Sequence, residues 1–256
     1  MKISIITITY NSAATVEDTI RSVVSQDYPD LEYIIIDGKS KDNTLKIVEK
    51  YKDKITKVVS EKDKGLYDAL NKGIKHATGD VIGMLHSDDL YANDQVISKV
   101  AAAFKKDNSV EGLYADLVFV NRNDTNKVMR VWNSGEYEED AFVRGWMPPH
   151  PTFFVKKECY EKFGGFNTEL KLSADYELML RMIHKNKIKL AYIPEMIVKM
   201  RMGGVSNVSF FVKLKANLED KMAWRLNDMR PGMMTAILKP LRKIKQYFKR
   251  AYMFLM

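Results

Sequence analysis

Cysteine is almost absent from this chain: Cys159 is the only one among 256 residues, so no internal disulfide bond can form. This scarcity is typical of reducing compartments and excludes the disulfide-rich secreted class. No apolar run approaches the ~20 residues that a membrane-spanning helix needs. The apolar segment 2–10 lacks a small-residue cleavage site, and it predicts a buried strand instead of a signal peptide. We therefore expect a cytoplasmic protein, either free or peripheral at the inner face of the cell membrane.

Acidic residues are also absent after Asp228, although seven Lys and Arg residues follow it and the whole chain carries a net charge of +8. The pattern predicts a basic amphipathic helical tail over residues 207–256. An anionic membrane surface would suit such a helix, and a helix packed on the domain with a solvated basic face would explain it equally well. The apolar residues that share one side of it are Leu241, Ile244, Phe248 and Tyr252.

What the chain does contain is an ordinary globular composition, with 46% hydrophobic and 29% charged residues. The first hundred residues alternate strand-like runs rich in β-branched residues with helical stripes of apolar residues. This β-α-β-α-β-α-β pattern favours a mostly parallel sheet with helices on both faces. The expected strands cover residues 3–9, 33–36, 56–59 and 81–85.

Polar clusters follow each of these expected strands, at residues 9–11, 37, 61–63 and 87–89. Ligands of such folds bind beyond the carboxyl ends of the strands, so four aligned clusters indicate a site. Asp88 and Asp89 suit a hard divalent cation, Mg²⁺ or Mn²⁺, held together with substrate phosphate oxygens. The alternative for this pair alone is a solvated acidic turn before the next helix.

Four segments, residues 5–11, 33–44, 60–73 and 77–89, together resemble the family-2 glycosyltransferases in their order and spacing. The resemblance is dense to about residue 100 and patchy from there to residue 206. It implies a GT-A fold: a Rossmann-like, mostly parallel sheet flanked by helices, with a C-terminal helical extension. Residues 1–100 would form a nucleotide-binding half, and residues 101–206 an acceptor-binding half.

The resemblance also implies roles for individual residues of the first half. Thr9 and Tyr10 would line the nucleotide pocket, Asp37 would hydrogen-bond the base, and Asp63 would contact the nucleotide. Gly38 stands where the family more often has a second acid.

Residues 87–89 occupy the place of the family's DXD motif, with Ser87 in place of the first acid. Asp89 would ligate the metal, while Asp88 would contact the ribose, the metal or a metal-bound water. A divalent cation would stabilise the charge that develops on the leaving nucleoside diphosphate.

Inverting transfer further needs a general base, and Asp175 matches the family's position for it. Ala174 replaces a frequent acid there, and the alternative for Asp175 is an acid placed favourably in the first turn of a helix. His150 would line the acceptor or diphosphate site, with a core histidine as the alternative. Arg201 would offer a cation to the diphosphate from a closing loop, with a plain glycine turn as the alternative. His86 is interpreted as structural.

The implied substrates are a nucleotide diphosphate-sugar, with a UDP-sugar favoured, and a glycan or lipid-linked glycan of polysaccharide or lipopolysaccharide biosynthesis. The processive pattern Gln-x-x-Arg-Trp is missing, so one sugar per acceptor is expected. The alternatives are a non-catalytic nucleotide-sugar-binding or carbohydrate-binding protein and a sugar nucleotidyltransferase, although the glycine- and arginine-rich first loop of the latter is absent. A dehydrogenase is disfavoured because no Gly-x-Gly-x-x-Gly follows the first strand. Acids at the strand ends argue against nucleic acid as a partner.

Overall fold

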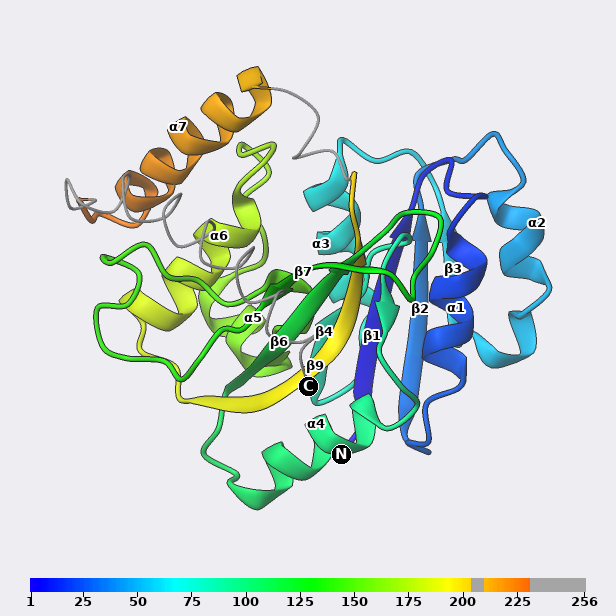
Figure 1. The fold of residues 1–256 in the computed structure, drawn as a ribbon, viewed down its shortest axis with the longest axis horizontal. Coiled ribbons are helices and arrows are strands. Elements are labelled where there is room, and N and C mark those ends of the chain that lie inside the picture. The colour runs from blue at the N-terminus through cyan, green and yellow to red at the C-terminus, as the bar shows by residue number, and fades with distance from the viewer. Residues whose placement is uncertain (204–209, 231–256) are drawn as a thin grey trace.

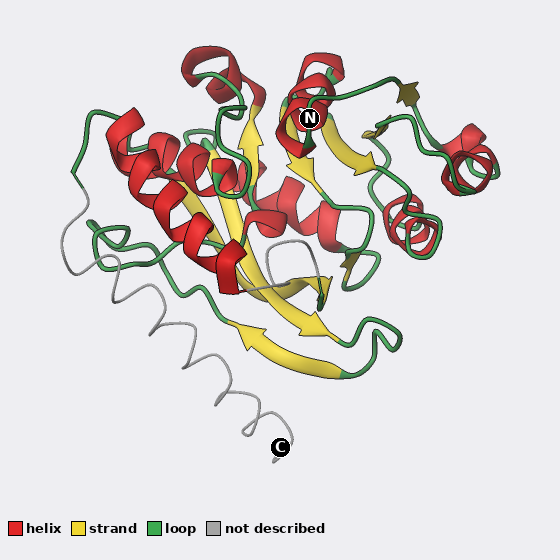
Figure 2. Ribbon diagram, turned by 90° about the horizontal axis from the view of Figure 1, so that it is seen from above, coloured by secondary structure: helices red, strands yellow, loops and turns green. Residues whose placement is uncertain are grey.

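The fold is an α/β sandwich in which one curled sheet carries helices on both faces, as Figures 1 and 2 show. The structure is a computed structural model, and it describes residues 1–203 and 210–230. The expected α/β class is thereby confirmed.

The first half of the chain alternates strands and helices as its sequence pattern predicts. Its elements are β1 (Ile3–Thr9), α1 (Val16–Val24), β2 (Leu31–Asp37), α2 (Thr44–Glu49), η1 (Lys52–Lys54), β3 (Lys57–Ser60), α3 (Leu66–His76) and β4 (Val81–Met84). β1 lies between β2 and β4 and runs parallel to both, while β3 adds to β2 in parallel. β1 and β2 are buried on both faces, which explains their nearly continuous apolar runs.

The second half is less regular. Its elements are β5 (Leu90–Tyr91), α4 (Val96–Lys106), β6 (Gly112–Val120), β7 (Val128–Trp132), η2 (His150–Thr152), β8 (Phe154–Lys156), α5 (Lys157–Phe163), α6 (Ala174–Met179), η3 (Leu180–Lys185), β9 (Leu190–Arg201) and α7 (Phe210–Leu226). The strand order of the whole sheet is β3-β2-β1-β4-β8-β6-β9-β5, with β7 paired to β6.

The parallel pairing that the sequence predicts holds from β3 to β4, and the sheet beyond β4 is mixed. β8 is antiparallel to both of its neighbours, β7 to β6 and β5 to β9, whereas β9 runs parallel to β6. A short polar turn joins β6 to β7, and such a turn can only join antiparallel strands.

Two apolar layers, one on each face of the sheet, form the core. Successive residues of β1 alternate between them: Ile5 packs with Ile20 and Val100 under α1 and α4, whereas Ile6 packs with Leu70 under α3. This sandwich fixes the strand ends, and with them the loops that follow β1, β2 and β4.

The helical extension after β9 is present as α7, which lies against α6 at one edge of the molecule (Figure 1). The expected basic tail covers residues 207–256, of which 207–209 and 231–256 lie outside the described residues. None of the described helices combines the length and the apolar character needed to cross a membrane.

Candidate functional site

The predicted site residues of the first half meet at one edge of the sheet. Thr9 and Asp37 are register partners at the carboxyl ends of β1 and β2. Residues 87–89 follow the neighbouring strand β4, and Ser87 Oγ lies 2.9 Å from Ser12 Oγ in the loop after β1. The structure thus places the predicted nucleotide-binding residues and the acid pair at the carboxyl ends of β1, β2 and β4, the edge at which this fold class binds its ligands.

Asp37 is fully buried, and its carboxylate joins three loops. Thr9 Oγ1 donates to Oδ1 at 3.0 Å, and Ser60 Oγ donates to Oδ2 at 2.7 Å. Ser40 donates its backbone N–H to Oδ2 at 3.0 Å and its hydroxyl to Oδ1 at 2.5 Å. These four bonds offset the cost of burying a charge and hold the ends of β1, β2 and β3 together. A direct contact of Asp37 with the base stays a prediction.

Tyr10 and Asp63 lie around Gly38, which directly follows Asp37. A Cβ at Gly38 would sit 3.3 Å from Tyr10 Cδ2 and would meet the Asp63 carboxylate, so a side chain at this position would displace the Asp63 side chain. Tyr10 is 61% exposed, an unusual exposure for a large aromatic ring. An accessible ring beside a carboxylate can stack on a flat ligand while the acid accepts hydrogen bonds from it.

The two carboxylates of the acid pair, Asp88 and Asp89, differ in how deeply they are buried. Asp88 is half-buried, whereas the Asp89 side chain is 1% exposed. Asp89 Oδ1 accepts the backbone N–H of Arg201 at 3.2 Å, and Asp89 Oδ2 has no hydrogen-bond partner among the described residues. Burial, together with the neighbouring charge of Asp88, raises the pKa of Asp89 well above its usual value.

A buried carboxylate oxygen without a partner is an open ligand position. A divalent cation bound there would supply the missing charge and favour the ionised form of Asp89. No group of three or more His, Cys, Asp or Glu side chains within residues 1–203 and 210–230 could hold a metal by itself. The residues therefore fit a cation that takes one or two protein carboxylates and completes its shell with substrate phosphate and water, as Mg²⁺ and Mn²⁺ do.

Arg201 ends β9 beneath this acid pair, and its side chain is 4% exposed. The guanidinium pairs with Asp18 of α1 at 2.5 Å and donates to the carbonyl oxygens of Asp88 at 2.9 Å and Arg122 at 3.2 Å. Its bonds to Asp18 and Asp88 tie the acid-bearing loop to α1. The expected contact of Arg201 with a diphosphate stays a prediction, and it would require the guanidinium to leave these acceptors.

Asp175 lies in the first turn of α6, and side chains from two distant segments contact its carboxylate. Tyr67 of α3 donates its hydroxyl to Oδ1 at 3.3 Å, and His150 Nδ1 lies 3.3 Å from Oδ2. The His150 ring lies 5.3 Å from the ring of His86, which precedes the acid pair by two residues. A chain of rings thus connects the strand-end acids to Asp175, and both parts of the predicted site face one region.

The pKa values of both histidines in this chain of rings are lowered, which favours their neutral forms. Burial and the neighbouring His150 lower the pKa of His86 to about 4. Burial also lowers the pKa of His150, although Asp175 and Asp88 oppose the shift. A neutral His150 can still donate an N–H from Nδ1 to the Asp175 carboxylate.

α7 secures the segment that leads into α6. Glu219 is 8% exposed, and its Oε2 accepts the backbone N–H groups of residues 171, 172 and 173 at 2.9, 2.7 and 3.1 Å. Tyr176 directly follows Asp175, and its hydroxyl accepts a hydrogen bond from Trp224 Nε1 at 2.9 Å. The position of Asp175 therefore depends on contacts made by α7.

Tyr67, His86, Asp18 and Glu219 are the site residues that sequence reasoning missed or interpreted as structural. Tyr67 lies within a segment that the sequence already singled out, residues 60–73. The contacts of Asp18 and Glu219 join residues far apart in the chain, and no local pattern signals them.

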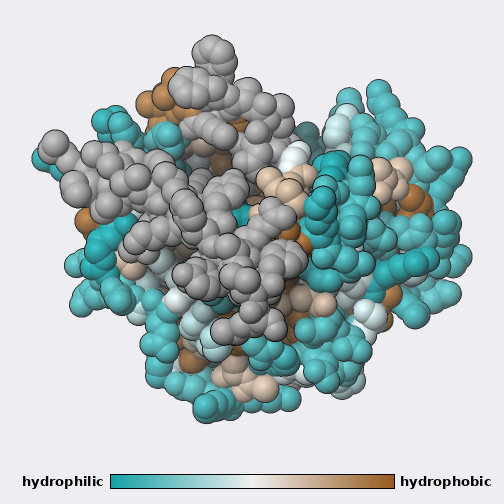
Figure 3. Space-filling model, in the orientation of Figure 1, coloured by the Kyte–Doolittle hydropathy of each residue, from teal (hydrophilic) through white to brown (hydrophobic). Residues whose placement is uncertain are grey.

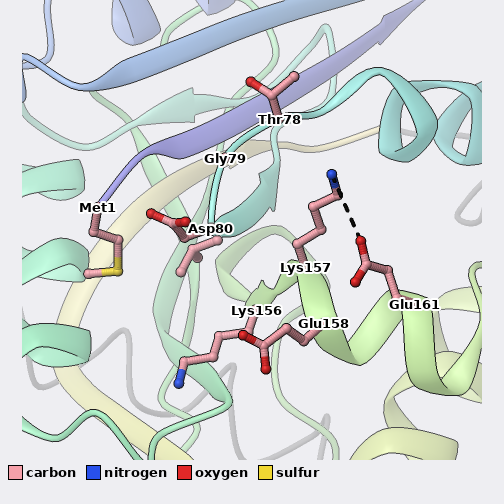
Figure 4. Close-up of a pocket in the computed structure, with 9 residues that line it drawn as sticks. Met1, Thr78, Gly79, Asp80, Lys156, Lys157, Glu158 and Glu161 are labelled. Carbon is pink, nitrogen blue, oxygen red and sulfur yellow. Dashed lines mark ion pairs between the residues drawn. The ribbon is translucent and has the colours of Figure 1, made fainter.

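A second hollow, of about 390 Å³, opens at the opposite edge of the sheet, between Met1, the start of β4 and the start of α5 (Figure 4). Asp80, Lys156, Glu158 and the pair Lys157–Glu161, 3.9 Å apart, give it charges of both signs. The predicted site residues lie at the carboxyl ends of the strands, so this hollow is not part of the site.

Comparisons with known proteins show the family to which the chain is similar. The model of the family described as "Glycosyl transferase family 2" matches residues 4–161. An uncharacterized glycosyltransferase of Mycobacterium tuberculosis is 30% identical over 181 residues, which cover 70% of this chain and 68% of that protein. A PGL/p-HBAD biosynthesis glycosyltransferase of Mycobacterium bovis is 25% identical over 208 residues, covering 80% of this chain and 78% of the relative.

Solved structures share the fold. S. aureus TarS 1-349 in complex with UDP-GlcNAc superposes with a TM-score of 0.71 at 22% identity, covering 89% of this chain. The present chain spans 65% of that TarS chain, less than two thirds of its length. The mannosyltransferase PcManGT of Pyrobaculum calidifontis, in complex with GDP-Man and Mn²⁺, gives a TM-score of 0.66 at 19% identity, covering 94% of this chain and 69% of that one.

Proposed function

This chain belongs to glycosyl transferase family 2, and on that premise we propose that it moves a sugar from a nucleotide diphosphate-sugar to an acceptor hydroxyl, with inversion at the anomeric carbon. The observation that carries the proposal is the convergence of two carboxylate groups. The acid pair at residues 88 and 89 and the carboxylate of Asp175 face one region, connected by His86 and His150. A displacement needs one group at the leaving diphosphate and another at the attacking hydroxyl.

In the proposed reaction Asp175 accepts the proton of the acceptor hydroxyl. The acceptor oxygen forms a bond to the anomeric carbon, and the bond from that carbon to the diphosphate oxygen breaks on the opposite face. The electron pair leaves with the nucleoside diphosphate. Tyr67 and His150 keep the carboxylate oriented, because each contacts one of its oxygens.

Metal dependence is the second part of the proposal. Asp89 and Asp88 would hold Mn²⁺ or Mg²⁺, and the cation would supply charge stabilisation for the leaving diphosphate. The unpartnered Oδ2 of Asp89 and the raised pKa of its carboxyl support this assignment. The PcManGT structure, in complex with GDP-Man and Mn²⁺, is consistent with it.

The identities of the donor and the acceptor are the third part of the proposal. We favour a UDP-sugar as the donor, in keeping with the structure of TarS in complex with UDP-GlcNAc. The structure of PcManGT in complex with GDP-Man supports the alternative, a GDP-sugar. Within residues 1–100, Tyr10 and Asp63 would contact the donor, and the buried pair Thr9 and Asp37 would shape the pocket, with residues 101–206 around the acceptor. A glycan or lipid-linked glycan acceptor agrees with the relative named for PGL/p-HBAD biosynthesis.

A donor panel tests the proposal. Purified protein is incubated with UDP-, GDP- and dTDP-sugars and Mn²⁺ or Mg²⁺, while release of nucleoside diphosphate is followed and binding is measured by calorimetry. We expect one donor to be hydrolysed slowly, with loss of this activity on EDTA treatment and in Asp89→Ala. Asp53→Ala, which removes an exposed acid of η1, is the matched control and should keep the activity. The proposal would be overturned if none of the donors bound in the presence of metal and none was hydrolysed.

A further inference from the structure

The outer face of α7 carries an apolar stripe. Seven large hydrophobic side chains are exposed among the described residues, and four of them lie on this helix. Their spacing of four residues places them on successive turns of one side. They are Leu214, Leu218, Met222 and Leu226, which are 50%, 58%, 41% and 38% exposed. Figure 3 shows brown, hydrophobic atoms at the upper left, where α7 lies in Figure 1.

The stripe is not the surface of a loosely attached helix. The opposite side of α7 is fixed to the domain through Glu219, through Trp224 and through Asn227, which donates to Glu177 at 2.9 Å. Ala223 and Trp224 are buried against α6 and its surroundings. Within residues 1–203 and 210–230, the helix therefore has one face that holds the domain and one face with exposed side chains.

Basic residues accompany the stripe. Lys215, Lys221 and Arg225 are exposed on the same side of the helix, and the exposed residues between positions 214 and 226 include no acid. The remaining exposed residue of that span is Asn217. The face thus presents apolar side chains interleaved with cations, a combination that suits an interface between hydrocarbon and anionic groups.

This charge pattern distinguishes between the candidate partners. A second copy that docked face to face through α7 would bring three cations against three cations, which disfavours a symmetric dimer. A nucleic acid would satisfy the cations but would leave four apolar side chains without a partner. A bilayer with anionic headgroups satisfies both, because leucine and methionine enter the acyl region while Lys and Arg stay at the phosphates.

We propose that the outer face of α7 docks the enzyme on an anionic membrane surface. The inference concerns a part of the chain outside residues 4–161, the segment that the family model matches. It goes beyond the proposed transfer reaction, and vesicle binding is measured without donor or acceptor. Its failure would therefore leave the proposed reaction untouched.

Vesicle sedimentation with the full chain tests the proposal. Vesicles of phosphatidylcholine with phosphatidylglycerol are compared with vesicles of pure phosphatidylcholine. The apolar variant is Leu218→Gln with Met222→Gln, and its matched control is Val58→Gln with Leu66→Gln, two exposed residues of the first half. The charge variant is Lys221→Gln with Arg225→Gln, and its control is Lys52→Gln with Lys54→Gln, two exposed lysines of η1.

We expect the wild type to bind the anionic vesicles and to be released by salt. The apolar variant should lower this binding about tenfold or more, because two side chains lose their burial in the bilayer. The charge variant should lower it about tenfold on anionic vesicles and should leave the weak binding to pure phosphatidylcholine unchanged. Both controls should bind like the wild type.

Three outcomes would overturn the proposal. The first is an equal loss of binding in the variants and in their controls. The second is a wild-type dimer in analytical ultracentrifugation that the apolar variant dissociates, which would make the stripe a contact between copies. The third is a wild type that does not bind anionic vesicles, combined with an apolar variant that melts at a lower temperature than the wild type. This result would mean that another part of this chain covers the stripe.

Discussion

The two halves of the site are built by different means. On the side proposed to bind the donor, Asp37 is fully buried, and four hydrogen bonds from Thr9, Ser40 and Ser60 fix its carboxylate. On the side proposed to bind the acceptor, the Asp175 side chain is 23% exposed and has two contacts of 3.3 Å, from Tyr67 and His150. The Asp37 carboxylate is saturated with hydrogen bonds and rigidly held, whereas the Asp175 carboxylate is able to exchange hydrogen-bond partners. A base that must receive a proton needs this freedom, and a residue that shapes a pocket does not.

The largest effect should come from Asp175→Asn, which keeps the shape of the side chain but removes the base. We expect kcat for transfer to fall about 10³-fold, within the range typical of general bases, while donor affinity stays unchanged. Transfer assays and calorimetry measure the two quantities, with Glu169→Gln, an exposed acid of the same half, as the control. A loss of donor affinity in Asp175→Asn would show that Asp175 also takes part in donor binding, and that the two sides are not separate.

That the predicted donor residues lie at one edge of the sheet could be foreseen from the sequence, because their signals are local. Each predicted polar cluster directly follows a strand of β-branched residues, and the ends of parallel neighbouring strands meet at one edge of the sheet. The glycine after Asp37 leaves room for the Asp63 carboxylate, which a side chain at position 38 would displace.

On the proposed acceptor side the sequence singles out Asp175 and His150 but not the side chain that holds Asp175 in place. The hydroxyl of Tyr67 reaches Asp175 across 108 positions of the chain, and at the acid pair Arg201 pairs with Asp18 across 183. Contacts of this range have no periodicity or spacing that a single sequence displays. For the same reason the pattern of the first strands did not reveal that the sheet becomes mixed beyond β4.

The second prediction concerns the saturated carboxylate. Asp37→Ala leaves the buried hydroxyl of Thr9 and the half-buried groups of Ser40 and Ser60 without their acceptor, so the free energy of unfolding should fall by about 3 kcal/mol. Donor binding should be lost with it, because the loops after β1 and β2 separate. Urea unfolding and calorimetry measure both effects, and Asp53→Ala should change neither. A variant with unchanged unfolding would show that the donor side is less rigid than the hydrogen bonds indicate.

The third prediction concerns α7. Glu219→Ala leaves three backbone N–H groups of residues 171–173 without their acceptor, which should cost about 2 kcal/mol of unfolding free energy. Because this segment leads into α6, kcat should also fall while donor affinity is kept. Glu219→Gln retains an acceptor oxygen and should recover most of both losses. If Glu219→Ala melts earlier but transfers at the wild-type rate, α7 supports the fold without positioning the base.

The fourth prediction tests whether Tyr67 positions Asp175. Tyr67→Phe keeps the ring that stacks on Phe166, at 5.6 Å between centroids, and removes only the hydroxyl that reaches the carboxylate. We expect kcat to fall about tenfold, with the donor KM unchanged and the lower limb of the pH–rate profile displaced. Tyr160→Phe, a buried tyrosine outside the site, is the control. A change in donor KM alone would assign Tyr67 to the donor side.

The smallest effect should come from Glu32, at the end of β2 opposite to Asp37. Burial raises the pKa of Glu32, but hydrogen bonds from Ser4 and Thr78 lower it by more, so the net shift is downward. A lowered pKa in the folded state stabilises the fold at pH values above the unfolded pKa of about 4.3, and this contribution is lost as the pH falls through the folded pKa.

Glu32→Gln should therefore cost about 1 kcal/mol of unfolding free energy near neutral pH. The difference between the variant and the wild type should shrink as the pH is lowered, because the wild-type carboxyl then becomes protonated. Urea unfolding over a pH series measures this difference, and donor binding should stay unchanged throughout, since Glu32 lies at the far end of the strand from the site. A loss of donor binding in Glu32→Gln would show that β2 transmits strain along its length, and that the saturated carboxylate of Asp37 does not isolate the donor side from the rest of the sheet.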